Sequence, residues 1–349
     1  MTTAPHFDLA RYTRQMIHPA IGDEGQRALG AARVLLVGCG ALGTHIADTL
    51  TRAGVGMLRI VDRDFVELHN LQRQVLFDED DLAEGTPKAL AAAQKLRRIN
   101  STVTIEAVVD DANASNITAL LDSIDLILDG TDNFETRYLL NDAAVRAGLP
   151  WIYGGVLATY GMTMTILPGE TACLRCVFPD PPPAGAAPTC ETAGVLGPAV
   201  AAIAALEATE AIKVLVGARE AINRELLALD VWRLTLDRLP AARQATCPAC
   251  GDGAHTFPFL DPATASRTVA LCGRNAVQIT LAPPTTLPLP ALAERLRPVG
   301  AVRYNAHLLR FQPVGAGQEL VIFPNGRAIV HGTDDPALAK TLYARYVGM

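Results

Sequence analysis

Four cysteines occur in two Cys-x-x-Cys pairs, a spacing typical of metal-binding turns. The first pair is Cys173 and Cys176, and the second is Cys247 and Cys250. Two such turns supply four thiolates, the ligand set of a tetrahedral zinc site that leaves no coordination position for water or substrate. The spacing therefore predicts a structural Zn²⁺ ion, with two unrelated redox or buried cysteine pairs as the alternative.

A glycine-rich segment, GCGALG, is the second candidate site, because it follows an apolar run at 33–37 and precedes a segment with helical periodicity. In such a turn the glycines let the backbone approach an anion, and the next helix supplies N–H groups. Asp62 follows the next predicted strand and is placed to bind ribose hydroxyls. Alone, these features favour an NAD-dependent oxidoreductase. The cofactor-binding residues expected in the turn are Gly38, Gly40, Ala41 and Gly43.

Charged residues beyond Asp62 favour a triphosphate instead. A dinucleotide has only a pyrophosphate, whereas ATP needs fixed cations such as Arg73 and Lys88 when charge develops on its α-phosphate. Asp132, after a later strand, can hold Mg²⁺ between phosphate oxygens. Taken singly, these residues could be a surface charge, a lysine in a first helical turn and a helix N-cap. Together, at consecutive strand ends, they favour an ATP·Mg²⁺ site.

Strands and helices alternate in the first part of the chain, which predicts a Rossmann-like, doubly wound, mostly parallel α/β sheet with its ligand at the carboxyl ends of the strands. Residues 151–167 contain two strand-like runs, so they are expected to form an antiparallel extension. Residues 195–206 are apolar, too short to span a bilayer, and predicted to be a buried helix. The other expected strands are 33–37, 58–61, 104–109, 126–128 and 228–237, and the expected helix is 87–99.

Two domains are expected: an ATP-binding domain over residues 1–253 and a small C-terminal α+β module over residues 267–349. Five prolines in 179–188 predict a semi-extended loop inside the first domain. The module is predicted to contain one strand at 267–281, a helix at 289–300, short strands at 301–311 and 319–330, and a helix at 335–347.

The candidate nucleotide site resembles that of the MoeB/ThiF family (HesA/MoeB/ThiF), bacterial relatives of the ubiquitin-activating enzymes. The similarity covers roughly residues 8–252. The motifs that carry it are RYTRQ at 11–15, GCGALG at 38–43, DRDFVELHNLQRQ at 62–74, TPK at 86–88 and DGTDN at 129–133.

This resemblance implies ATP-dependent adenylation of the C-terminal glycine carboxylate of a ubiquitin-like sulfur-carrier protein of MoaD or ThiS type, which ends in Gly-Gly. The adenylate would then become a thiocarboxylate for molybdopterin, thiamine or tRNA thiolation, with sulfur from a desulfurase or rhodanese. Arg14 is expected to act as an arginine finger from the other subunit, which implies a homodimer. The other implied ligands are Asp62 and Asp64 with Gln74 for the nucleotide, Asn70, Arg73 and Lys88 for the phosphates, and Asp132 for Mg²⁺.

Cys190 lies between the proline-rich loop and the apolar helix. A helix N-terminus lowers the pKa of a thiol, and the family resemblance also places a cysteine here, so Cys190 is a candidate nucleophile, with a bystander role as the alternative. Cys39 and Cys272 are expected to be packed side chains. No cysteine lies in a glycine- and arginine-rich loop typical of a rhodanese, so the C-terminal module is expected to be an interaction module.

Composition limits the remaining function classes. The chain has 349 residues, 50% hydrophobic, and a net charge of −6, which argues against a nucleic-acid partner. Seven cysteines, an odd number, and the lack of an apolar secretory region favour a cytoplasmic protein without a disulfide framework or membrane segment. Besides the oxidoreductase, two alternatives remain: an ATP-dependent tRNA-base dehydratase of the same superfamily, and an inactive scaffold that binds a ubiquitin-like protein.

Overall fold

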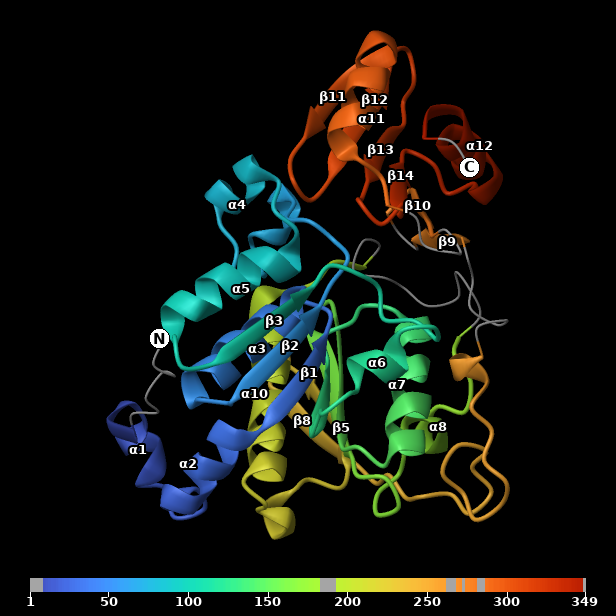
Figure 1. Ribbon diagram of the computed structural model, residues 1–349. Coiled ribbons are helices and arrows are strands. Elements are labelled where there is room, and N and C mark those ends of the chain that lie inside the picture. Colours follow the sequence, from blue (N-terminus) through green and yellow to red (C-terminus); the bar gives the residue numbers. More distant parts are fainter. Residues whose placement is uncertain (1–8, 183–192, 262–267, 272–273, 281–285, 348–349) are drawn as a thin grey trace. The chain divides into compact units, whose positions relative to one another are not determined.

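The computed structural model describes residues 9–182, 193–261, 268–271, 274–280 and 286–347. These residues belong to two compact units (Figure 1). The first unit comprises Met1–Pro182 and Val195–Thr264, and the second includes Ala265–Met349. No helix among the described residues is long and apolar enough to cross a membrane.

The first unit is built on one eight-stranded sheet with the order β3-β2-β1-β4-β5-β6-β7-β8. Strands β3 to β5 of that order are parallel, and β5 to β8 are antiparallel, which confirms the predicted fold class. The strands are β1 (Arg33–Val37), β2 (Met57–Val61), β3 (Thr104–Val108), β4 (Leu126–Asp129), β5 (Trp151–Leu157), β6 (Tyr160–Ile166), β7 (Leu226–Asp230) and β8 (Thr235–Leu239).

Helices cover both faces of this sheet because side chains alternate along each strand. Leu36 of β1 packs toward α3 (Ala41–Ala53), α5 (Lys88–Ile99) and α10 (Gly197–Leu215). Leu35 packs on the other face, with α6 (Ile117–Leu120) and α7 (Phe134–Ala147). Figure 1 shows helices on both sides of the sheet. The shorter elements of this unit are η1 (Leu9–Tyr12), α1 (Thr13–Met16), α2 (Gly22–Ala31), η2 (Leu68–Asn70), α4 (Glu79–Glu84), α8 (Leu174–Val177), η3 (Arg219–Ala221) and η4 (Pro258–Leu260).

The prediction of one strand at 228–237 is wrong, because the chain turns back between β7 and β8. The Asp230 carboxylate accepts the backbone N–H groups of Trp232 at 2.9 Å and Arg233 at 3.2 Å. Leu234 has a φ of 55°. An Asp side chain that bonds the backbone ahead of it favours a turn over a continued strand.

The second unit is a six-stranded antiparallel sheet with the order β11-β12-β13-β14-β10-β9 and a core that includes Phe311 and Tyr343. The predicted single strand at 267–281 is wrong: it is a pair, β9 and β10, with Asn275 at a φ of 44°. Asn tolerates this left-handed conformation better than most residues. The elements are β9 (Thr268–Leu271), β10 (Ala276–Ile279), α11 (Leu289–Leu296), η5 (Arg297–Val299), β11 (Gly300–Tyr304), β12 (Leu309–Pro313), β13 (Glu319–Ile322), β14 (Ala328–His331) and α12 (Pro336–Tyr346).

Candidate functional site

The glycine-rich turn joins β1 to α3 and packs backbone against backbone on the end of β4. Gly38 has a φ of 90°, and a Cβ atom there would lie 2.5 Å from the carbonyl oxygen of Gly130. A Cβ atom on Gly43 would lie 2.0 Å from the Gly38 oxygen. Only glycine fits these positions. Gly40 precedes α3, and no side chain caps this helix end, so its N–H groups are available to an anion.

Asp62, directly after β2, is tied to this turn. One carboxylate oxygen accepts the N–H of Cys39 at 2.6 Å, and the other accepts the N–H of Asp64 at 2.7 Å. Each carboxylate oxygen has two acceptor sites, so each can accept a second hydrogen bond, as from a ribose hydroxyl. Burial raises the pKa of Asp62, and the nearby Lys88 ammonium opposes that shift.

Lys88 is a buried cation rather than an ordinary surface charge of a helix. It begins α5, and its side chain is 3% exposed. Its ammonium lies 3.5 Å from the Asp64 carboxylate, and its backbone N–H donates to the backbone carbonyl oxygen of Asp64 at 2.9 Å. The structure therefore places the predicted residues Asp62, Asp64 and Lys88 side by side.

The segment after Asp62 supplies three more of the predicted residues. Gln74 is buried, and its Nε2 atom lies 3.8 Å from the position of a Cβ atom on Gly40. Asn70 is buried in η2, where its side-chain oxygen accepts the N–H of Glu67 at 3.2 Å. Arg73 is half-buried and donates to the carbonyl of His69 at 2.7 Å. Gln74 is thus adjacent to the glycine turn.

Asp132 is exposed in the loop between β4 and α7. The N-cap of α7 is Asn133, whose side chain accepts the N–H of Thr136 at 2.9 Å. The explanation of Asp132 as an N-cap is therefore wrong. The preceding Gly130 packs against Gly38, which brings the loop that carries Asp132 to the glycine turn.

Arg14 lies at the other end of these helices. Asn100, which follows the last residue of α5, donates to the hydroxyl of Tyr12 at 2.8 Å. Gln15 donates at 3.0 Å to the carbonyl of Ala53, the last residue of α3. The opposite ends of these two helices lie at the glycine turn. Because α3 has 13 residues and rises about 1.5 Å per residue, exposed Arg14 is separated from the turn of its own chain by about 20 Å.

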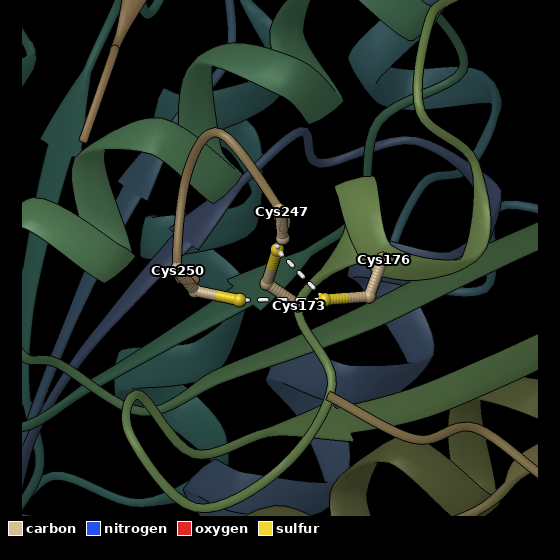
Figure 2. Close-up of side chains that lie close together, drawn as sticks. All are labelled: Cys173, Cys176, Cys247 and Cys250. Carbon is tan, nitrogen blue, oxygen red and sulfur yellow. Dashed lines mark hydrogen bonds between the residues drawn. The ribbon is translucent and has the colours of Figure 1, made fainter. Parts of the chain in front are cut away.

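The four predicted cysteines form one cluster, with thiols that point toward one another from two separate segments (Figure 2). Their sulfur atoms all lie within 4.8 Å of one another. Cys173 is 3.8 Å from Cys176 and 3.6 Å from Cys247, and Cys176 is 3.3 Å from Cys250. Four Zn–S bonds of about 2.3 Å in a tetrahedron put sulfur atoms about 3.8 Å apart. The cluster therefore fits a zinc ion.

The other cysteines bear on function less directly. Cys190 and Cys272 lie outside the described residues, so the nucleophile role of Cys190 stays a prediction. Cys39 is fully buried, and burial raises the pKa of its thiol well above the usual range. A neutral, buried thiol agrees with its expected packing role.

Sequence reasoning missed a group of buried charged residues beneath the Asp132 loop. They are Asp129 at the end of β4, Arg137 on α7 and Glu207 on α10. Burial raises the pKa of both carboxyl groups. The available signal was a charged residue within an apolar stretch, such as Glu207 in AIAALEA.

This sheet carries a glycine turn, strand-end carboxylates and a buried lysine, the arrangement of an α/β protein with a nucleotide-type site. The same unit carries a four-cysteine cluster that fits a metal ion. The sequence profile of the ThiF family matches residues 12–249. The chain belongs to the ThiF family, which confirms the resemblance seen in its motifs.

Two curated relatives are similar to this chain over more than nine tenths of their own length. The sulfur carrier protein ThiS adenylyltransferase of Bacillus subtilis is 43% identical over 341 residues, which cover 97% of this chain and 99% of that protein. The sulfur carrier protein adenylyltransferase of Thermus thermophilus is 42% identical, over 70% of this chain and 92% of that protein. The crystal structure of Escherichia coli MccB with ATP shares the fold, with a TM-score of 0.60, 23% identity and coverage of 69% and 74%.

Proposed function

We propose that this chain is an adenylyltransferase that activates the C-terminal carboxylate of a ubiquitin-like sulfur-carrier protein of the ThiS type with ATP. The observation that carries the proposal is the buried ammonium of Lys88 beside Asp62, at the N-termini of α3 and α5. A fixed cation there suits a triphosphate. The similarity to the Bacillus subtilis protein extends over both units of this chain and favours a ThiS-type carrier.

The reaction requires positioning and charge neutralisation more than proton transfer. The carrier carboxylate is already ionised, so its oxygen attacks the α-phosphorus without a general base. A new P–O bond forms as the bond to the β-phosphate breaks, and pyrophosphate leaves. Lys88 and Arg73 neutralise charge on the phosphates while Asp62 holds the ribose. Asp132 would hold Mg²⁺, which when bound neutralises phosphate oxygens.

The second subunit completes the site in this proposal. Arg14 lies about 20 Å from the turn of its own chain, so the arginine of another copy would serve each site. A homodimer of this kind lets the guanidinium approach the phosphates from outside. The adenylate would then accept sulfur from a desulfurase or rhodanese, and the structural zinc ion would hold the two cysteine segments together.

ATP–pyrophosphate exchange tests the proposal directly. The purified protein is assayed with Gly-Gly-ending carriers of ThiS and MoaD type, as wild type, Asp132→Ala and the surface control Asp48→Ala. Exchange that depends on the ThiS-type carrier and is lost only in Asp132→Ala is the expected result. No exchange with any carrier, together with tight NAD binding, would overturn the proposal in favour of an oxidoreductase.

A further inference from the structure

Arg137 and Asp129 form a buried ion pair directly beneath the loop that carries Asp132. Arg137 lies in the second turn of α7 and is 8% exposed, and Asp129 at the end of β4 is 0% exposed. The Arg137 Nε atom is 3.4 Å from one Asp129 oxygen. Burying both charges costs solvation free energy, so an ion pair of this kind is weak evidence for a contribution to stability. Its position suggests a role in the site.

Both members of the pair bind the same residue of the loop. An Arg137 NH2 group donates to the Thr131 carbonyl at 2.9 Å. The second Asp129 oxygen accepts the Thr131 N–H at 2.8 Å and its hydroxyl at 2.6 Å. Gly130 in turn donates to the carbonyl of Val37 at 2.8 Å. The residues before Asp132 are thus fixed from three directions.

The surroundings leave the guanidinium little freedom. Its central carbon lies 5.5 Å from the ring centres of Phe134 and Tyr153. A Cβ atom on Gly155 would lie only 3.3 Å from an Arg137 nitrogen, so β5 leaves just enough room for this side chain. The Asp129 and Asp132 carboxylates both interact favourably with the Arg137 charge. Arg137 is therefore held in one orientation.

We infer that Arg137 is a positioning residue that, with Asp129, fixes residues 130–133 and so places the Asp132 carboxylate for the cation that accompanies ATP. The inference rests on the proposed function, because the role of Asp132 as a cation ligand belongs to that proposal. A planar guanidinium can donate to the Thr131 carbonyl while its Nε faces the Asp129 carboxylate as an ion pair. The compact ammonium of a lysine cannot match this fork geometry.

Arg137→Lys tests this inference against Arg146→Lys, a change in the same helix at a residue whose hydrogen bond to Thr118 is exposed. The first readout is amide hydrogen exchange of residues 130–133, which does not depend on activity. We expect exchange at these amides to become at least about tenfold faster in Arg137→Lys, since a hydrogen bond from a charged group is lost. The control should match wild type.

The second readout is the Mg²⁺ dependence of ATP–pyrophosphate exchange. Arg137→Lys should need about tenfold more Mg²⁺ for half-maximal rate, while the KM for ATP at saturating Mg²⁺ stays within about twofold. Thr131→Val, which removes only the hydroxyl bond to Asp129, should act in the same direction and serves if Arg137→Lys does not fold.

The two proposals fail in different ways. Loop amides that exchange at wild-type rates in both Arg137→Lys and Thr131→Val would overturn the positioning role, whatever the enzyme does. An equal loss of rate at every Mg²⁺ concentration would overturn it as well. If the wild-type protein shows no ATP–pyrophosphate exchange, that result would instead count against the proposed function. Amide hydrogen exchange would still decide whether Arg137 fixes the loop.

Discussion

The backbone N–H of Cys39 donates a 2.6 Å hydrogen bond to the carboxylate of Asp62, which joins the glycine turn after β1 to the end of β2. This bond sets the distance between the N-terminus of α3, which would face the phosphates, and the carboxylate that is proposed to hold the ribose. A second N–H, that of Asp64, fixes the other oxygen of Asp62 at 2.7 Å. The carboxylate is therefore oriented before a nucleotide binds.

Asp62→Asn should weaken ATP binding by about 10- to 100-fold, because hydrogen bonds to a charged group contribute about 1.5–3 kcal/mol. The amide also presents an NH₂ group to one of the two backbone donors, which disturbs the orientation of the side chain. Calorimetric titration with ATP measures the effect, and Asp48→Asn on the outer side of α3 is the matched control. Unchanged ATP affinity in Asp62→Asn would remove Asp62 from the nucleotide site.

Gly130→Ala should both destabilise the protein and abolish nucleotide binding. The added Cβ atom would lie 2.2 Å from the carbonyl oxygen of Gly38, a backbone atom that cannot move without distorting the turn. We expect a lower free energy of unfolding by about 1–3 kcal/mol, as for other overpacked positions. Gly253→Ala, where a Cβ atom meets nothing within 4 Å, is the control for urea unfolding. Equal free energies of unfolding for Gly130→Ala and Gly253→Ala would show that the glycine turn accommodates the added methyl group, and would contradict the prediction.

The sequence was sufficient for strands β1, β2 and β4, because each is a short, largely apolar run that ends at a glycine or a carboxylate. The sequence identified Lys88 as a candidate site residue. It could not predict that the Lys88 side chain is buried, because the burial depends on how α5 packs beside Asp64. The β7–β8 turn was hidden because Asp230 and Leu234 give no glycine or proline signal. Arg137 was missed for a similar reason: its partners Asp129 and Thr131 meet it only in the folded chain.

Zinc removal should unfold the region around the two cysteine segments. Cys176→Ser removes one of four thiolates that lie within 4.8 Å of one another. Structural zinc contributes several kcal/mol or more, so the unfolding temperature should fall by at least about 10 °C. Differential scanning calorimetry with metal analysis measures this, with Cys190→Ser as the control that keeps its zinc. Wild-type protein that is stable and free of zinc would contradict the structural role.

Asp142 should make the protein less stable as the pH rises from about 4 to about 6. Burial raises the pKa of Asp142 to about 6, above an unfolded value of about 3.9. Between these two pKa values the Asp142 carboxyl is protonated in the folded protein but ionised in the unfolded chain. The free energy of unfolding therefore falls as the pH rises from about 4 to about 6, and it is restored when the pH returns below about 4.

A shift of about two pKa units corresponds to about 3 kcal/mol. The difference in unfolding free energy between wild type and Asp142→Asn should therefore change by up to that amount between pH 4 and pH 7, in favour of the variant at the higher pH. Urea unfolding measures it, and the exposed Asp122→Asn should show no such trend. A difference that is constant with pH would refute the buried-carboxyl explanation.

Arg14 and Asp132 should complement each other in mixed dimers. Arg14 lies at the far end of α3, about 20 Å from the glycine turn of its own chain. In the proposed dimer, Arg14 of each chain would therefore contribute to the nucleotide site of the other chain. Arg14→Ala and Asp132→Ala should each abolish pyrophosphate exchange when expressed alone. Random assembly makes half of the dimers mixed, and each mixed dimer has one intact site, so co-expression should restore about one quarter of wild-type activity. No restoration, with mixed dimers shown by mass spectrometry, would mean that Arg14 does not act across the interface.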